Sequence, residues 1–327
     1  MDRSSASGNK DGTNQDDTVR LCIEVFAVNV VTWSSDHIGC RPTSAEAKKQ
    51  HLMSDSKTTS PTELHHKVYG AGNPVLCIHG FGASLFSWRN FVDPVSQNYQ
   101  LILIDLKGSG NSPKPPGPGY STQDHADLIY KFILDRDLKN LTLVGNSFGG
   151  SLALLLSLML IDHEPGRLRA LILIDPGAYP QYTPGYLKLI GFPLIGALAV
   201  YLTPANWMAK IVLRLAYYDP KKITAEQIAA YAAPLAAPGG KRALLETGKR
   251  IIPPNIDKLL ARYKDINVPT LIIWGKQDKI ISPDAGKLLV QAIPNSLLEW
   301  IDQCGHVPQE ERPEATTPLV LNFLQSL

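Results

Sequence analysis

Several features that mark specialised classes of protein are scarce or missing in this chain of 327 residues. Its four cysteines form no Cys-x-x-Cys pair, so neither a disulfide scaffold nor a thiol-rich zinc site is expected. The 32 basic and 30 acidic side chains leave a formal net charge of +2. This balance gives no electrostatic footprint for nucleic acid, and no long basic run suggests an anionic membrane. We therefore expect no nucleic-acid partner.

Long apolar runs are also rare. The segment Met1–Asp17 lacks the basic start and the early apolar run of a signal peptide. Leu152–Ile161 is too short to cross a bilayer, and Tyr186–Leu202 is interrupted by a lysine and a proline. We expect no stable membrane span, a buried or substrate-facing helical region at Tyr186–Leu202, and a cytoplasmic location.

Residues 1–60 differ in composition from the rest of the chain. Met1–Asp17 is rich in Ser, Asn, Asp and Gly, a composition that seldom packs, and Val19–Trp33 could form a lone strand. Met53 is a plausible alternative start, because everything interpreted below follows it. We predict that residues 1–60 are an extension that is poorly ordered or dispensable.

From Leu64 onward, short apolar runs alternate with longer helical patterns, which is the signature of βαβ units. The predicted strands are Val75–Ile78, Leu101–Ile104, Leu141–Val144, Leu171–Ile174, Thr270–Trp274 and Leu297–Ile301. The predicted helices are about Ser121–Asp135, Phe148–Ile161, Pro283–Ala292 and Pro313–Leu324. Strands of continuous apolar character are covered on both faces. The pattern therefore predicts an α/β fold with a mostly parallel sheet between helices.

The alternation stops between Pro176 and Val268, where Leu, Ala, Ile and Tyr recur at helical spacing. A helical insertion between two strands lies over the strand ends, where ligands bind in open α/β sheets. We predict a helical cap at 176–268 and an α/β core formed by 61–175 and 269–327.

The motif Gly145-Asn146-Ser147-Phe148-Gly149 matches G-x-S-x-G between a predicted strand and a predicted helix. A serine on such a tight turn needs neighbours without side chains, which the two glycines supply. The helix behind it offers free N–H groups and a positive dipole end. The motif predicts that Ser147 is a catalytic nucleophile.

A serine hydroxyl needs a base, and the base needs a carboxylate that fixes its tautomer. His306 lies on the loop after the last predicted strand, with Gly305 before it, and is the best-placed histidine. Asp278 follows the strand Thr270–Trp274 and gives the chain order Ser, Asp, His. Asp175, at the end of an earlier strand, is the second candidate for the carboxylate.

The turn His79-Gly80-Phe81-Gly82 follows an earlier strand and predicts the second half of an oxyanion hole. The backbone N–H groups of Phe81 and Phe148 are the expected donors. His79 is expected to organise this turn by hydrogen bonds rather than to act as a base. Asp105, in a glycine-rich turn that lacks the ending of a phosphate loop, is expected to bond backbone amides.

Four features follow one another along the chain: the turn His79–Gly82, the turn at Asp105, the elbow at Ser147, and Asp278 with His306. Together they resemble the α/β-hydrolase superfamily, in its lid-bearing branch, over about residues 63–327. The resemblance implies an eight-stranded, mostly parallel sheet with the cap inserted after the sixth strand. Haloalkane dehalogenases and epoxide hydrolases of that superfamily use an aspartate nucleophile, so Ser147 disfavours both.

The leading functional hypothesis is hydrolysis of a carboxylic ester through an acyl-enzyme, without a metal or an organic cofactor. The alternative is C–C bond hydrolysis of an aromatic ring-cleavage product. The elbow resembles the Gly-Asn-Ser-Met-Gly-Gly of that group apart from Phe148, and Asn90-Phe91 resembles its Asn-Phe pair. The chain departs from the group's Ser-Gly-Pro-Gly with Phe81-Gly82-Ala83-Ser84. A non-catalytic ligand receptor is the third hypothesis.

The expected partner is a small apolar ester with an acyl chain or an aryl group. An apolar aromatic pocket wall suits such a molecule. The predicted cap supplies eight aromatic residues, each of which could instead pack the cap's own core: Tyr179, Tyr182, Tyr186, Phe192, Tyr201, Trp207, Tyr217 and Tyr218.

Overall fold

The computed structural model describes residues 63–180 and 195–327, and all structural statements below concern these residues. Seven strands form one sheet in the order β1-β3-β2-β4-β5-β6-β7. Only β1 is antiparallel to its neighbour within this described sheet. The strands are β1 (His66–Tyr69), β2 (Pro74–Ile78), β3 (Gln100–Ile104), β4 (Leu141–Asn146), β5 (Leu168–Ile174), β6 (Thr270–Gly275) and β7 (Ser296–Ile301).

The helices belong to three groups along the chain. Those before β5 are η1 (Leu85–Phe91), α2 (Val92–Ser96), α3 (Thr122–Asp135) and α4 (Phe148–His163). Those between β5 and β6 are α6 (Ile195–Leu202), α7 (Ala205–Ala216), η3 (Pro220–Lys222), α8 (Ala225–Ala236), α9 (Gly240–Gly248), α10 (Ile256–Leu260) and η4 (Tyr263–Asp265). Those after β6 are α11 (Asp284–Ala292), α12 (Pro308–Glu311) and α13 (Pro313–Ser326).

The predicted α/β fold and its mostly parallel sheet are confirmed, but the strand count is corrected. The described residues form seven strands instead of eight, and the helices of 176–269, called the insert below, follow β5 rather than a sixth strand. The number eight came from the resemblance and had no counterpart in the sequence pattern. The possible strand at Val19–Trp33 and the predicted extension 1–60 lie outside the described residues.

The strand β1 was missed because it lies at the edge of the sheet. Its sequence, His-Lys-Val-Tyr, is partly exposed along its whole length, so it has no continuous apolar run. In contrast, every residue of β2, β4 and β6 is buried. Strands buried on both faces are the ones that an apolar run reveals.

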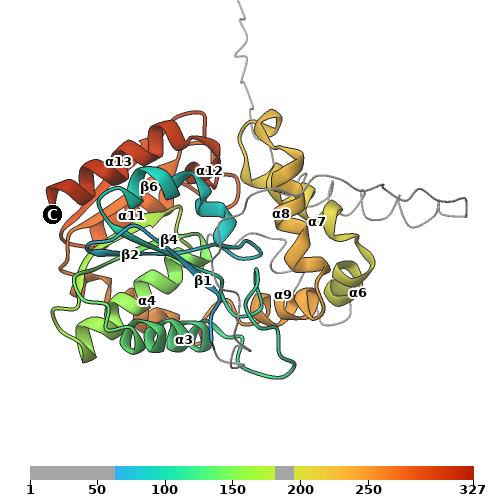
Figure 1. The fold of residues 1–327 in the computed structure, drawn as a ribbon, viewed down its shortest axis with the longest axis horizontal. Coiled ribbons are helices and arrows are strands. Elements are labelled where there is room, and N and C mark those ends of the chain that lie inside the picture. The colour runs from blue at the N-terminus through green and yellow to red at the C-terminus, as the bar shows by residue number, and fades with distance from the viewer. Residues whose placement is uncertain (1–62, 181–194) are drawn as a thin grey trace, which may run out of the picture. The chain divides into compact units, whose positions relative to one another are not determined.

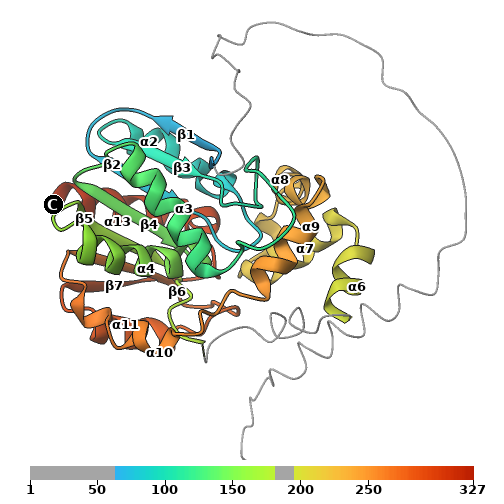
Figure 2. The same cartoon turned by 90° about the horizontal axis from the view of Figure 1, so that it is seen from below.

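Two apolar layers hold the sheet between its helices. On one face, Leu76, Leu143 and Leu173 pack in a cluster with side chains of α3, α4 and α11. On the other face, Cys77 and Val144 pack with side chains of η1, α2 and α13. Figure 1 shows α13 on one side of the sheet and α3 and α4 on the other, and Figure 2 shows α3, α4 and α11 on the same side. Successive strand residues serve opposite layers because side chains alternate along a strand.

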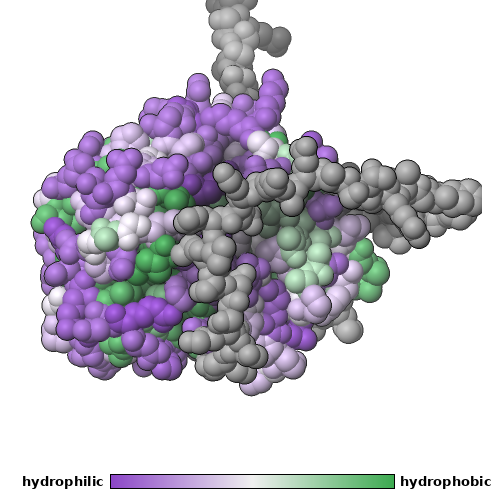
Figure 3. All heavy atoms as spheres, in the orientation of Figure 1, coloured by the Kyte–Doolittle hydropathy of each residue, from purple (hydrophilic) through white to green (hydrophobic). Residues whose placement is uncertain are grey.

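The insert lies beside the sheet in both views, at the side where α6 to α9 are labelled (Figures 1 and 2). Its C-terminal turn of α7 contacts the loop after β7, because the His306 N–H donates to the Ala216 carbonyl at 2.7 Å. The expectation of a buried or substrate-facing helical region at Tyr186–Leu202 is wrong for part of α6, where Leu198, Tyr201 and Leu202 are exposed and do not line the pocket of Ser147. Figure 3 shows apolar side chains gathered at this end of the insert.

The sequence predicts no stable membrane span. Within 63–180 and 195–327, no helix is both long enough and apolar enough to cross a bilayer. The first part of Tyr186–Leu202 lies outside the described residues.

Candidate active site

Ser147 lies on the tight turn between β4 and α4. Its backbone has φ 54° and ψ −118°, a conformation that costs a residue other than glycine about 1–3 kcal/mol. The turn is held by main-chain hydrogen bonds: the Ser147 N–H donates to Ile174 O at 3.1 Å, and the Gly177 N–H donates to Ser147 O at 2.9 Å. Because α4 begins at Phe148, Ser147 stands at the positive end of a helix dipole.

The two glycines of the motif are required by space. A Cβ on Gly145 would collide with the carbonyl oxygen of Gly149, and a Cβ on Gly149 would collide with that of Ile78. These carbonyls belong to the main chain, which cannot move aside without disturbing the sheet. The crowding that the sequence predicted at the turn is therefore present on both sides of Ser147.

His306 and Asp278 form a direct pair. Nδ1 of His306 lies 2.7 Å from Oδ2 of Asp278. The other oxygen of Asp278 accepts hydrogen bonds from the N–H groups of Ile280 at 2.7 Å and Ile281 at 3.1 Å. Since a carboxylate only accepts, the shared proton resides on Nδ1, which leaves Nε2 with a free lone pair in the neutral ring.

Nε2 is the ring nitrogen of His306 that Asp278 does not contact. This atom is buried and has no hydrogen-bond partner among the described residues. Ser147 and His306 both line the same pocket, together with Phe81 and Phe148. The structure thus brings together the predicted Ser147 and His306, with Asp278 on the far ring nitrogen of the histidine. A buried basic nitrogen without a partner next to a serine can accept the proton of its hydroxyl group.

Asp175, the second candidate for the carboxylate, has a different partner. Its Oδ1 accepts a hydrogen bond from the Gly275 N–H at 3.0 Å. It is fully buried and lies close to both Asp278 and His306. Burial, and next the negative charge of Asp278, raise the pKa of Asp175 well above its usual value.

Asn146 connects the turn at Ser147 to the loop that carries His306, called the histidine loop below. This role was not predicted from the sequence. Its side-chain amide donates to Ile174 O and to His306 O, both at 3.1 Å. These bonds fix the histidine loop to the end of β4. Gly-Asn-Ser was identified in the motif from the sequence. A local motif does not show to which distant carbonyl the asparagine amide donates a hydrogen bond.

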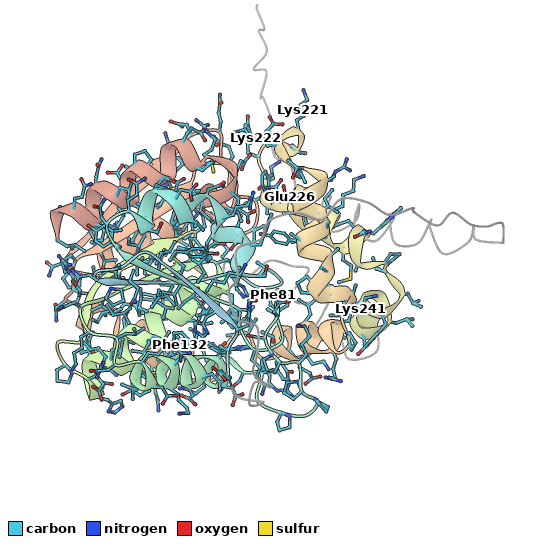
Figure 4. All side chains as sticks on the ribbon, in the orientation of Figure 1. Phe81, Phe132, Lys221, Lys222, Glu226 and Lys241 are labelled. Carbon is cyan, nitrogen blue, oxygen red and sulfur yellow. The ribbon has the colours of Figure 1, made fainter. Side chains whose placement is uncertain are left out.

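The turn after β2 approaches Ser147 closely. A Cβ on Gly80 would stand 3.2 Å from that of Ser147, so a side chain here would crowd Ser147. Figure 4 shows Phe81 where the core and the insert meet. As expected, His79 organises this turn, because its Nδ1 donates to Gly80 O at 2.8 Å and its Nε2 accepts from the Leu106 N–H at 3.0 Å.

The expectation for Asp105 is confirmed as well. Its carboxylate accepts hydrogen bonds from the N–H groups of Leu85 at 2.8 Å and Asn111 at 2.9 Å, and from His65 Nδ1 at 2.7 Å. These bonds connect the turns after β2 and β3. Hydrogen bonds to the ionised form lower the pKa of Asp105, although burial acts in the opposite direction.

Two adjacent glutamates that were not singled out from the sequence join the insert to the histidine loop. Glu311 accepts from the backbone N–H groups of Gly305 at 2.7 Å, Tyr218 at 3.0 Å and Asp219 at 2.7 Å. Glu310 pairs with Arg89 at 2.6 Å and accepts a short hydrogen bond from the Tyr231 hydroxyl. Both glutamates are buried, so these bonds replace the water that the carboxylates lose.

The pocket above Ser147 is lined mainly by apolar side chains. It encloses about 1210 Å³, including its open mouth. The core contributes Leu155 and Leu158 of α4, and the insert contributes apolar residues of two regions: Val212, Leu213, Ile251, Ile252, Pro253, Ile256 and Leu259. Among the described lining residues none is Lys, Arg, Asp or Glu.

The aromatic residues that line the pocket are mostly not the ones named from the sequence. Of the eight named, Tyr179 lines the pocket, whereas Tyr201, Trp207 and Tyr218 are exposed; Tyr231 and Tyr263, which were not named, also line it. Tyr217 is buried in an apolar cluster of the insert that also includes Ala83 and Val307 of the core. Tyr182, Tyr186 and Phe192 lie outside the described residues. Spacing along a helix cannot tell a pocket-facing side from a solvent-facing side when the helix has apolar residues on both.

A family model described as "Alpha/beta hydrolase family" matches residues 75–318. This range includes the sheet from β2 onward, the elbow at Ser147, Asp278 and His306. The chain belongs to the alpha/beta hydrolase family. The resemblance drawn from the motifs is therefore confirmed at the level of the family, and hydrolase chemistry follows from it.

The proteins that are similar to this alpha/beta hydrolase have more than one named activity. The 2-hydroxy-6-oxononadienedioate/2-hydroxy-6-oxononatrienedioate hydrolase of Cupriavidus pinatubonensis is 27% identical over 269 residues, which cover 80% of this chain and 90% of the relative. A meta-cleavage product hydrolase from Pseudomonas fluorescens IP01 has a TM-score of 0.67 at 24% identity, covering 80% of this chain and 94% of the other.

A thermophilic esterase from Thermogutta terrifontis is equally similar in structure. Its TM-score is 0.67 at 23% identity, covering 82% of this chain and 96% of the esterase. At such identities the two solved structures show the fold of this alpha/beta hydrolase and not its substrate. The substrate has to be argued from the pocket.

Proposed function

We propose that the protein is a serine hydrolase in which Ser147 is the nucleophile, His306 the general base, and Asp278 the carboxylate that orients the base. The observation that carries the proposal is the buried Nε2 of His306, which has no partner among the described residues and lines one pocket with Ser147. Asp278 on Nδ1 fixes the tautomer, so that in the neutral ring the proton is on Nδ1 and Nε2 is the acceptor.

The chemistry proceeds in two steps. The Ser147 oxygen attacks the carbonyl carbon while Nε2 takes its proton, and the N–H groups of Phe81 and Phe148 stabilise the negative oxygen. His306 then returns the proton to the leaving group, and an acyl-enzyme remains. Water, activated by the same nitrogen, attacks the acyl carbon and releases Ser147. Each step uses only groups of this chain and water.

The first candidate substrate is a carboxylic ester with an apolar acyl or aryl group. The lining of the pocket supports it, because apolar side chains from α4 and the insert surround the space above Ser147. In this proposal the insert, predicted at 176–268, is a cap that shapes the pocket over a core of 61–175 and 269–327. The exposed apolar side chains of α6 lie on the same insert.

The second candidate is C–C bond hydrolysis of an aromatic ring-cleavage product, and the names of the relatives favour it over the ester. The elbow Gly145-Asn146-Ser147 also fits that group. The substrate named for the Cupriavidus pinatubonensis relative is a dioate, which carries two carboxylates. A buried carboxylate needs a cationic or hydrogen-bonding partner, and no Lys or Arg is among the described lining residues. We therefore place an uncharged substrate first.

A comparison of substrates on one preparation tests this order. Purified protein is offered p-nitrophenyl butyrate and octanoate, a lactone, and a ring-cleavage dienoate, with Ser147→Ala as the matched control. We expect ester kcat/KM to exceed dienoate kcat/KM by at least ~100-fold, which corresponds to about 2.7 kcal/mol. A preference for the dienoate would make C–C hydrolysis the function. Turnover by Ser147→Ala equal to that of the unchanged protein would remove the serine mechanism, and binding without turnover would favour a receptor.

A further inference from the structure

Asp175 is a buried acid that the proposed mechanism leaves without a role. It follows β5 directly and has a φ of 43°, a left-handed conformation that is uncommon outside glycine. Its side chain is completely buried. Oδ1 accepts the Gly275 N–H at 3.0 Å, whereas Oδ2 is buried without a hydrogen-bond partner among the described residues. An unsatisfied carboxyl oxygen in the interior calls for a physical explanation.

The neighbours of Asp175 supply one. One oxygen of Asp175, one oxygen of Asp278 and one ring nitrogen of His306 all lie within 4.8 Å of one another. The strands explain this meeting: β5 and β6 are parallel neighbours with Ile174 opposite Ile273, so the residues that follow them reach the same edge. Two carboxyl groups therefore lie near one imidazole in a site where the side chains of both acids are buried and that of His306 is 6% exposed.

If both acids are ionised, the site holds an excess of negative charge. Two further titratable groups interact electrostatically with Asp175. They are Glu311, whose carboxylate accepts three backbone N–H groups, and Cys304. Burial raises the pKa of the Cys304 thiol, so it stays neutral and brings no positive charge. Two carboxylates at close range cannot both ionise cheaply in a buried site, so one of them keeps a proton.

A metal ion is a poorer explanation than a proton. Nδ1 of His306 and Oδ2 of Asp278 are 2.7 Å apart, which is a hydrogen-bond distance. Two ligands of one tetrahedral ion at about 2.0–2.1 Å from the metal stand about 3.3 Å from each other, so this pair is too close to share an ion. Both oxygens of Asp278 accept hydrogen bonds, from Ile280, Ile281 and His306, whereas Oδ2 of Asp175 accepts none from the described part of the chain and is the oxygen with room for a proton. The proton then belongs to Asp175.

We propose that Asp175 is a positioning residue: a neutral acid that supports the Asp278 carboxylate and that becomes the partner of His306 when the Asp278 carboxylate is removed. The inference rests on the proposed function, since it assigns a second acid to the same nucleophile system. It differs from a purely structural role, in which Asp175 only accepts the Gly275 N–H. An asparagine would fill that structural role equally well but could not ionise.

The test is a double-mutant cycle of Asp175→Asn and Asp278→Ala, with the rate of covalent labelling of Ser147 by a fluorophosphonate as the readout. Labelling reports the nucleophile whatever the natural substrate is. Asp175→Asn alone should slow labelling by less than ~10-fold, because its amide oxygen can still accept the Gly275 N–H and Asp278 keeps its bond to His306. Asp278→Ala should cost only ~100-fold, less than the ~10⁴-fold typical of losing the acid of a triad, since Asp175 replaces it.

The decisive comparison is Asp175→Asn in the Asp278→Ala background, where we expect a further loss of at least ~30-fold. An equal cost of Asp175→Asn in the two backgrounds overturns the inference while the proposed function stands. Absence of labelling at Ser147 in the unchanged protein overturns both. Melting curves verify that each variant is folded; should Asp278→Ala not fold, Asp278→Asn paired with the same Asp175→Asn gives the same comparison.

Discussion

All six residues of β6 are buried in the core, whereas Leu198, Tyr201, Leu202 and Trp207 of the insert are each more than half exposed. In the core, apolar side chains hold the sheet between its helices and fix where each strand ends. In the insert, they are divided between the pocket and the surface. The proposed chemistry depends on the precision of the core, and the choice of substrate depends on the insert.

An apolar cluster joins Leu213 and Ala216 of the insert to Ala83 and Val307 of the core, and polar contacts between the two regions lie near His306. The His306 N–H donates to Ala216 of α7, and Glu311 accepts two N–H groups at the end of that helix. The Arg89–Glu310 pair reaches Tyr231 of α8. Polar contacts of this kind require defined geometry, so they hold the histidine loop in place more effectively than apolar packing would.

The largest expected effect is on chemistry. We expect His306→Ala to lower kcat for ester hydrolysis by ~10⁴-fold or more, because Ser147 loses its base, while the protein remains folded. The exposed His163, at the end of α4, provides the control variant His163→Ala. Steady-state kinetics with p-nitrophenyl butyrate measures both. A loss of less than tenfold in His306→Ala would show that the base lies elsewhere.

The next prediction compares a tryptophan of each region. Trp88 is fully buried under the sheet, whereas Trp207 in α7 is 52% exposed. We expect Trp88→Ala to lower the free energy of unfolding by about 3–5 kcal/mol, because it leaves a cavity in the core. Trp207→Ala should change it by less than about 0.5 kcal/mol. Urea denaturation of both variants makes the measurement, and similar losses would contradict the contrast between core and insert.

The acid stability of the core–insert boundary gives a third prediction. His125 of α3 is buried, and its Nε2 lies 3.3 Å from Thr247 Oγ1 of the insert. Burial lowers the pKa of His125 to about 4 from its ordinary 6.5. Between these two values the unfolded chain binds a proton that the folded protein does not. The stability is therefore fully present above pH 6.5 and is lost as the pH falls towards 4, by about 3 kcal/mol.

Denaturation at pH 7 and pH 4.5 measures this loss. His125→Phe, which cannot bind a proton, should lose clearly less stability on acidification than the unchanged protein. His163→Phe, at an exposed position, serves as the control and should lose as much as the unchanged protein. If His125→Phe and the unchanged protein lose the same amount, the buried histidine does not determine the acid limit.

The smallest effect concerns substrate length. Leu259 lines the pocket from the insert, so Leu259→Trp should fill its apolar end. We expect kcat/KM for p-nitrophenyl octanoate to fall by ~10-fold, which is equivalent to the loss of contacts to about two methylene groups. The kcat/KM for p-nitrophenyl acetate should change by less than ~3-fold. The exposed Leu202 supplies the control Leu202→Trp. A parallel fall for both esters would show that Leu259 does not set chain length.

The sequence predicted the features that depend on short stretches of the chain. The strands β2 to β6 appeared as apolar runs because they are buried on both faces, and Ser147 appeared because its turn needs Gly145 and Gly149. The order Ser147, Asp278, His306 followed from strand ends. Each of these signals is contained in a few consecutive residues.

The features that escaped prediction depend on distant contacts. Glu310 and Glu311 look like ordinary surface charges in the sequence, yet they are buried because Arg89 and the backbone of the insert reach them. Asn146 meets the carbonyl of His306, which is 160 residues away along the chain. Tyr231 and Tyr263 line the pocket but were not named from the sequence, because amphipathic spacing does not show which face of an insert helix meets the pocket.

The most direct test of the account is to locate the covalent adduct after brief treatment with a fluorophosphonate. Peptide mass spectrometry should find one modification, on Ser147, in the unchanged protein and none in Ser147→Ala. The His306→Ala variant should be labelled at least ~1000-fold more slowly. An adduct on another residue, or equal labelling of Ser147→Ala, would contradict the assignment of Ser147 as the nucleophile.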